Sequence, residues 1–102
     1  MKPLKAQIWN KSWWISETDP ESLKTIYRDR LNKAHFDIID EIEHYFEPQG
    51  YTKLFLLAES HLAIHTFPED WKTYIELSSC VKRQFDNFLT LEKLWIDNTT
   101  YP

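Results

Sequence analysis

The chain of 102 residues has one cysteine, one glycine and no long apolar run. One cysteine cannot form an internal disulfide, which is typical of proteins of the reducing cytoplasm. The longest apolar run, residues 54–58, is far too short to cross a bilayer, and the first residues lack the apolar stretch of a secretory signal. We therefore expect a cytoplasmic protein with no membrane partner.

The chain also lacks a basic excess. Its formal net charge is −4, which argues against binding to nucleic acid. The length predicts a single domain over residues 1–102, and a domain of this size buries only about 60–65% of its unfolded surface, so a partner surface is plausible. The aromatic side chains, five of them Trp, are numerous enough to build a core of large residues.

Two segments read as helices. Asp19 followed by Pro20 is an N-cap with proline at the first helical position, and apolar residues then recur at helical spacing to about Ala34. Phe85, Phe88 and Leu89 suggest a second helix that ends near residue 94. Residues 94–97 could form one further short strand.

Five segments read as strands: 6–15, 36–46, 51–60, 61–67 and 74–80. Residues 47–50 suit a tight turn, with proline second and the only glycine fourth. In residues 61–67 alternation places His61, His65 and Phe67 on one face. The sum predicts an α+β fold, a two-layer sandwich with an antiparallel sheet and two helices on one face.

The middle of the chain holds a pattern of reactive side chains. Glu59-Ser60-His61 is followed by His65 five residues after the serine and by Cys80 twenty residues after it. Taken singly, the histidine is more often a packed strand residue and the cysteine inert packing.

Residues 44–80 with this pattern resemble the self-cleavage and active-site segment of the prokaryotic-type pyruvoyl-dependent S-adenosylmethionine decarboxylase proenzymes. The resemblance implies autocatalytic cleavage between Glu59 and Ser60 by an N-to-O shift. The former Ser60 then becomes a pyruvoyl cofactor, which forms a Schiff base with the substrate amine and acts as electron sink. No metal is implied. The activity would be a lyase reaction of spermidine and other polyamine biosynthesis.

The resemblance also implies roles for individual residues. His65 would be the processing base, and Cys80 the proton donor of the decarboxylation. Thr52 would assist processing, although a strand threonine is otherwise explained by β-propensity. Phe46 and Phe67 would sandwich the adenine of S-adenosylmethionine, and Glu69 would hold its ribose hydroxyls; a further histidine, His44, matches a family position. A homodimer is implied, with sites at or near the subunit interface.

Geometry adds a condition. A straight strand over residues 60–65 would separate Ser60 from His65 by about 16 Å and place them on opposite faces. We therefore expect a sharp turn near residues 60–61 that brings His65 back beside the cleavage point.

Three alternatives stay open. The same chemistry could decarboxylate ornithine or arginine, although neither has a purine or a diol for Phe46, Phe67 and Glu69. A non-catalytic relative could regulate an active decarboxylase, and a generic α+β binding domain would make the pattern a coincidence. The segment departs from the family at Val81, where the family usually has glycine.

Overall fold

The sheet has five antiparallel strands, with β4 at its centre. A computed structural model describes residues 6–99, and the strand order is β1-β5-β4-β3-β2. In chain order the elements are β1 (Trp9–Ile15), α1 (Pro20–Lys33), β2 (Ile38–Tyr45), β3 (Tyr51–Leu57), β4 (Ser60–Phe67), the 3-10 helix η1 (Pro68–Asp70), β5 (Lys72–Ser79) and α2 (Lys82–Thr99). The predicted α+β fold is confirmed.

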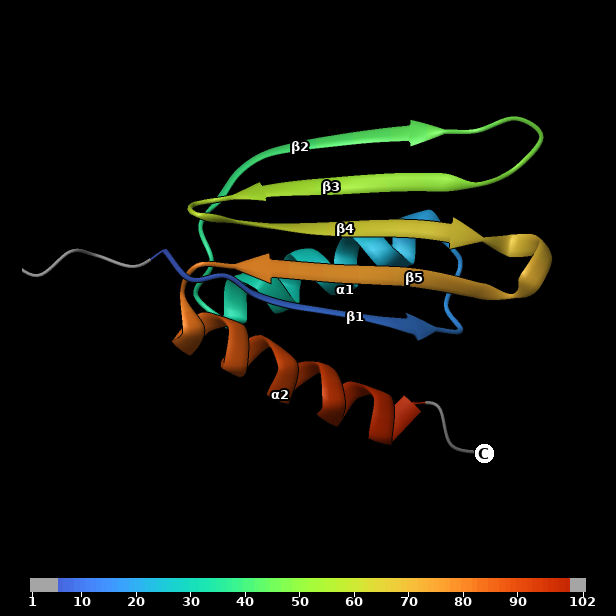
Figure 1. The fold of residues 1–102 in the computed structure, drawn as a ribbon. Helices are drawn as coiled ribbons and strands as arrows, with labels where there is room; N and C mark the ends of the chain where they lie inside the picture. Colours follow the sequence, from blue (N-terminus) through green and yellow to red (C-terminus); the bar gives the residue numbers. More distant parts are fainter. Residues whose placement is uncertain (1–5, 100–102) are drawn as a thin grey trace, which may run out of the picture.

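Both helices contribute to one hydrophobic core on one side of the sheet. Figure 1 shows α1 behind the sheet and α2 along the side of β1. Leu23, Tyr27 and Leu31 of α1 are fully buried, as is Phe88 of α2. Alternate strand residues meet them, because successive side chains of a strand point to opposite faces. The other face of the sheet is thereby left to carry a different set of side chains.

The first helix begins where the sequence predicted. The Asp19 carboxylate accepts hydrogen bonds from the Ser22 backbone N–H and hydroxyl, both at 2.9 Å, and Pro20 occupies the first turn. These contacts satisfy donors that the first turn of a helix leaves free. The same hydrogen bonds hold the pKa of Asp19 below its usual range.

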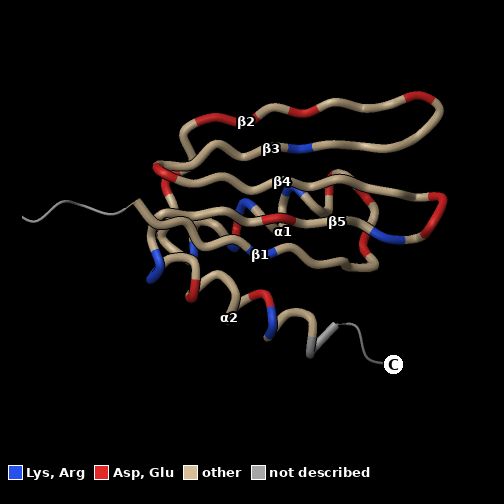
Figure 2. Tube along the Cα trace, in the orientation of Figure 1, with Lys and Arg blue, Asp and Glu red and all other residues tan. Residues whose placement is uncertain are grey.

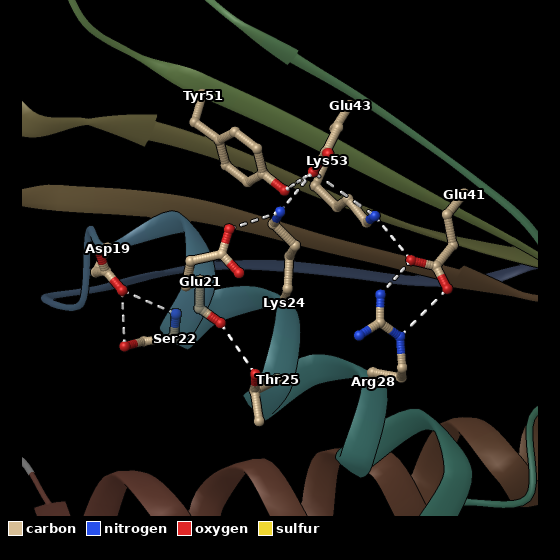
Figure 3. Close-up of polar contacts among 10 residues, drawn as sticks. All are labelled: Asp19, Glu21, Ser22, Lys24, Thr25, Arg28, Glu41, Glu43, Tyr51 and Lys53. Carbon is tan, nitrogen blue, oxygen red and sulfur yellow. Dashed lines mark hydrogen bonds and ion pairs between the residues drawn. The ribbon is translucent and has the colours of Figure 1, made fainter.

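A polar layer joins α1 to the β2–β3 hairpin (Figure 3). Lys53 of β3 is buried and lies 2.7 Å from the Glu41 carboxylate, to which Arg28 of α1 also donates. Lys24 of α1 lies 3.1 Å from Glu43, which also accepts a hydrogen bond from the Tyr51 hydroxyl at 2.6 Å. Since each buried charge has an opposite partner, the layer fixes the hairpin on the helix without an uncompensated ion.

A second polar cluster joins both helices to β1. The buried Glu92 carboxylate of α2 accepts hydrogen bonds from Trp13 at 2.9 Å, Tyr27 at 2.8 Å and Arg30 at 2.7 Å. Breaking such a buried pair typically costs about 3–5 kcal/mol, because one charge is left without a partner. The cluster therefore orients the two helices on the sheet.

Several predicted boundaries differ from the structure, and the second helix, predicted to end near residue 94, ends at Thr99. The strand predicted over residues 51–60 ends at Leu57, and Ser60 begins β4. The predicted turn near residues 60–61 is wrong, because the chain turns at Ala58 and Glu59 instead. The possible strand over residues 94–97 is also wrong, because α2 continues to Thr99. Over residues 6–99, neither helix is apolar enough to serve as a transmembrane span.

Candidate functional site

The sheet face opposite the helices carries most of the candidate residues; we call it the open face. Strand pairing places its side chains in rows that cross all five strands. One row consists of His44, Thr52, His65, Tyr74 and Trp14. The neighbouring row consists of Ile42, Leu54, Ala63, Glu76 and Ser12. The open face thus combines reactive side chains with exposed apolar ones.

His65 has a defined polar partner in this row. Its Nδ1 lies 2.9 Å from the Thr52 hydroxyl oxygen, and its ring lies 6.2 Å from that of Tyr74. Because Thr52 is directly opposite His65 in the β3–β4 ladder, the pairing register itself sets this contact. Thr52 therefore has a specific partner and is more than a residue of high β-propensity.

A pocket of about 310 Å³ opens at one end of the row. Its lining includes Phe46, Thr52, His65, Phe67 and Glu69, five of the candidate residues. Phe46 and Phe67 are 49% and 40% exposed, so both present ring surface to solvent. The pocket therefore offers two aromatic rings, a carboxylate and a histidine to one ligand.

The chain around this pocket is acidic. Figure 2 shows acidic residues in the β2–β3 loop and in the β4–β5 loop, and one basic residue at the start of β5. The acidic ones are Glu47, Glu69 and Asp70, all exposed. Fixed negative charge beside a pocket favours a cationic ligand.

Ser60 lies at the other end of β4, directly after the β3–β4 turn. Glu59, the residue before it, has a φ of 61° in the left-handed region. A non-glycine residue there carries strain, and such residues cluster at functional sites. The Glu59 carbonyl accepts a hydrogen bond from the Cys80 backbone N–H at 3.1 Å. The predicted scissile peptide is thus strained and has its carbonyl oxygen bound.

The Ser60 hydroxyl also has a fixed partner. It donates a hydrogen bond to the Ser79 hydroxyl at 2.8 Å, across the β4–β5 ladder. Ser79 is not part of the sequence pattern that predicted the site. Its position beside Cys80 and the β4–β5 register could have pointed to it.

The candidate residues form two groups rather than one. Ser60 and Cys80 lie at one end of β4, whereas His65 and the pocket lie at the other. Residues 60–65 run as one straight strand, so a rise of about 3.3 Å per residue separates Ser60 from His65 by about 16 Å. The expectation that His65 lies beside Ser60 in the same chain is wrong, because the turn precedes Ser60 instead of following it.

Cys80 is exposed and lies between β5 and α2. An exposed thiol is accessible to a ligand, unlike a cysteine that only fills the core. Among residues 6–99 no three His, Cys, Asp or Glu side chains form a group that could hold a metal ion.

Comparison with known proteins gives a consistent result. Residues 16–94 match the family described as S-adenosylmethionine decarboxylase. A relative from Prochlorococcus marinus (strain MIT 9313) is 42% identical over 62 residues, 61% of this chain and 50% of the relative. One from Archaeoglobus fulgidus is 31% identical over 74 residues, 68% of this chain and 66% of the relative. Both are named S-adenosylmethionine decarboxylase proenzyme.

The chain spans about half the length of the first of these curated relatives. Among solved structures, the adenosylmethionine decarboxylase of Aquifex aeolicus vf5 aligns with a TM-score of 0.66 and 22% identity. The alignment covers 85% of this chain and 81% of that one. This likeness establishes a shared fold.

Proposed function

Because this chain belongs to the S-adenosylmethionine decarboxylase family, we propose that it is a proenzyme that cuts itself between Glu59 and Ser60. The mature protein then decarboxylates S-adenosylmethionine, which yields the aminopropyl donor for polyamine synthesis. The geometry around one peptide bond carries the proposal. Glu59 has a left-handed φ, its carbonyl oxygen accepts a hydrogen bond from the Cys80 N–H, and the Ser60 hydroxyl donates to Ser79.

In the first step the Ser60 Oγ attacks the Glu59 carbonyl carbon. The new C–O bond replaces the C–N bond, the hydroxyl proton passes to the Ser60 nitrogen, and an ester results. Negative charge develops on the Glu59 oxygen during the attack. The Cys80 N–H, 3.1 Å from that oxygen, stabilises this charge as an oxyanion-hole donor does.

In the second step a base removes the α-hydrogen of Ser60, and Glu59 leaves as a carboxylate. Water then replaces the Ser60 nitrogen, which departs as ammonia and leaves an N-terminal pyruvoyl group. That group would supply an electron sink for decarboxylation. Ser60 fits this conversion, because it is half-buried at the start of the central strand β4. It pairs with Ser79, the residue before Cys80.

His65 is the base, and it acts from a second copy of the chain. The 16 Å separation along β4 is too long for proton transfer within one chain, which needs contact at about 3 Å. The Thr52 hydroxyl lies 2.9 Å from His65 Nδ1. In the tautomer whose Nδ1–H donates to Thr52, the lone pair of Nε2 takes the proton. We therefore assign the working unit as a homodimer, in which each site combines Ser60 of one subunit with His65 of the other.

The sheet offers a simple symmetry for this arrangement. When two open faces stack about a two-fold axis that crosses the middle of β4, the start of one β4 lies over the end of the other. His65 of the second copy then approaches the α-carbon of Ser60 from the open face, while the Ser60 hydroxyl points to the helix side and pairs with Ser79. The exposed apolar side chains that would be covered include Ile42, Leu54 and Leu56, which are 66%, 40% and 52% exposed. Their burial supplies the hydrophobic driving force for dimerisation.

The substrate pocket completes the site. Phe46 and Phe67 stack on the adenine, and Glu69 accepts hydrogen bonds from the ribose diol. The acidic loops suit a sulfonium cation.

Cys80 returns a proton to carbon after carbon dioxide leaves. A thiol with this task needs a reducing compartment, so we place the single-domain chain of residues 1–102 in the cytoplasm.

Intact-mass measurement tests the cleavage. Purified chain should give two fragments, the second beginning with a pyruvoyl group in place of Ser60, and Ser60→Ala should stay whole. Wild-type chain that remains intact on long incubation would refute the proenzyme.

Mixing two inactive variants tests the shared site. Ser60→Ala and His65→Ala chains should each stay uncut as homodimers. When they are co-expressed, about half of the His65→Ala chains should be cut if subunits pair at random, because the mixed dimer has one complete site. A mixture that stays uncut while the wild type is cut would show that His65 does not act across subunits.

Labelled substrates test the pocket. Carboxyl-labelled S-adenosylmethionine should release labelled carbon dioxide, and ornithine and arginine should not. Phe67→Ala should weaken substrate use by about 1–3 kcal/mol without slowing self-cleavage, and Phe67→Trp should retain both. A preference for ornithine or arginine would keep the cleavage chemistry and exclude the adenine pocket.

A further inference from the structure

We propose that Ser79 is a positioning residue for self-cleavage: it holds the Ser60 hydroxyl in place for its attack on the Glu59 carbonyl. The inference rests on the proposed cleavage and adds a residue to it. Ser79 would neither touch the substrate nor serve as the base.

The Ser79 hydroxyl is held in place from two directions. The Val81 backbone N–H donates to its oxygen at 2.9 Å, and its own hydroxyl donates to the Val81 carbonyl at 3.2 Å. The side chain is also nearly fully buried, with 1% of its surface exposed. Ser79 therefore presents an acceptor whose position is set by the backbone that leads into α2.

Ser60 is the residue that uses this acceptor. Its hydroxyl donates to Ser79 Oγ at 2.8 Å, a short and favourable O–H···O distance. A serine hydroxyl at the end of a strand otherwise samples several rotamers, each pointing the oxygen in a different direction. The contact selects one of them, which removes rotational freedom from the nucleophile before the reaction.

Two consecutive residues thus hold the two reacting groups. Cys80 N–H binds the Glu59 carbonyl oxygen, and Ser79 Oγ binds the Ser60 hydroxyl. Both contacts come from the end of β5 and the residue after it, which continue into α2. The carbonyl and its nucleophile are therefore fixed relative to each other by one short segment.

Cleavage rates of variants test this role. Ser79→Ala should slow self-cleavage by about 10- to 100-fold, the usual effect of misplacing a reacting group. Ser79→Thr keeps the hydroxyl and should restore most of the rate. Ser78→Ala is the matched control, because Ser78 precedes Ser79 and alternation points it to the open face; it should be cut at the wild-type rate.

Hydroxylamine distinguishes positioning from loss of the base. The Ser79→Ala chain should resist hydroxylamine, because it is slow to form the ester, whereas His65→Ala should stall at the ester and be split. Thermal unfolding of each variant separates these effects from lost stability. If Ser79→Ala does not fold, Ser79→Cys, which keeps the size but is a poor acceptor, should show the same slow cleavage.

The outcomes are distinct. If the wild type is cut and the folded Ser79→Ala chain is cut equally fast, the role of Ser79 is overturned. The proposal that the chain is a proenzyme would then still hold. Faster cleavage of Ser79→Ala would also overturn the role of Ser79, because the contact would then restrain the nucleophile. A wild-type chain that stays whole would overturn both proposals.

Discussion

At the scale of single residues, two threonines on facing strands show how position decides a hydroxyl's effect. Thr52 lies on the open face, and its hydroxyl bonds to His65. Thr66 follows His65 on β4 and points into the core, where its buried Oγ1 has no hydrogen-bond partner among the described residues. The same side chain therefore has a hydrogen-bond partner at Thr52, whereas at Thr66 its unpaired buried hydroxyl costs stability.

Thr52→Val should slow self-cleavage about 3- to 10-fold, because the nearly isosteric side chain removes one hydrogen bond to His65 Nδ1. Cleavage followed by intact mass measures the rate. Thr66→Val is the matched control: it should be cut at the normal rate and should gain about 1 kcal/mol in unfolding free energy, since an unpaired buried hydroxyl is replaced by a methyl group. Equal rates for Thr52→Val and wild type would argue against the Thr52–His65 contact in processing.

At the scale of elements, α1 and the β2–β3 hairpin depend on one carboxylate. Glu41 of β2 interacts with Arg28 of α1 and with the buried Lys53 of β3 (Figure 3). The Arg28 guanidinium, helped by Lys53, lowers the pKa of Glu41 from 4.5 to about 2. A lowered pKa in the folded state means that the ionised carboxylate stabilises the fold at pH values above its ordinary pKa.

Acid should therefore weaken the fold as Glu41 becomes protonated. The wild-type melting temperature should fall as pH drops from about 4.5 towards about 2, the interval between the ordinary and the folded-state pKa of Glu41. The Glu41→Gln variant should melt at a lower temperature than the wild type at neutral pH. Its melting temperature should fall less than that of the wild type across that pH interval. Glu21→Gln removes a carboxylate that is 77% exposed and should follow the wild-type profile. Parallel profiles for Glu41→Gln and wild type would contradict this account.

At the scale of the whole molecule, the exposed apolar side chains of the open face are the main asymmetry. Helices cover one face of the sheet, whereas Ile42, Leu54 and Leu56 remain exposed on the other. An ionised group lies among them, since hydrogen bonds from Tyr74 and Asn10 hold the pKa of Glu76 below its usual range. A second copy of this chain docked on the open face would therefore have to match both the apolar area and this charge.

Leu54→Lys should convert the proposed dimer into a folded monomer, because it places a charge in the middle of the apolar surface. Sedimentation analysis should show the change in mass, circular dichroism should stay native, and self-cleavage should stop for lack of the partner's His65. Asn32→Lys adds the same charge on the exposed side of α1 and should leave assembly and cleavage intact. Monomeric Leu54→Lys that still cleaves would contradict the shared site.

The amino-acid sequence was sufficient to predict the α+β fold, the start of α1 and the family. These follow from local signals: the Asp19-Pro20 cap, the alternation of residues 61–67 and the spacing of Ser60, His65 and Cys80. Local patterns are read within a few residues, so they also place side chains on one face or the other. They do not predict where each element ends, as at the ends of β3 and α2, because tertiary packing determines those boundaries.

Only the tertiary structure decided which candidate residues meet. The register of β3, β4 and β5 sets Thr52 against His65 and Ser60 against Ser79, and no single strand contains that information. The turn at Ala58 and Glu59 makes β4 straight from Ser60 to Phe67, so it separates Ser60 from His65. Spacing along the chain therefore predicts candidate residues, and strand pairing determines which of them can meet within one chain. Contacts across a sheet depend on register and not on sequence distance.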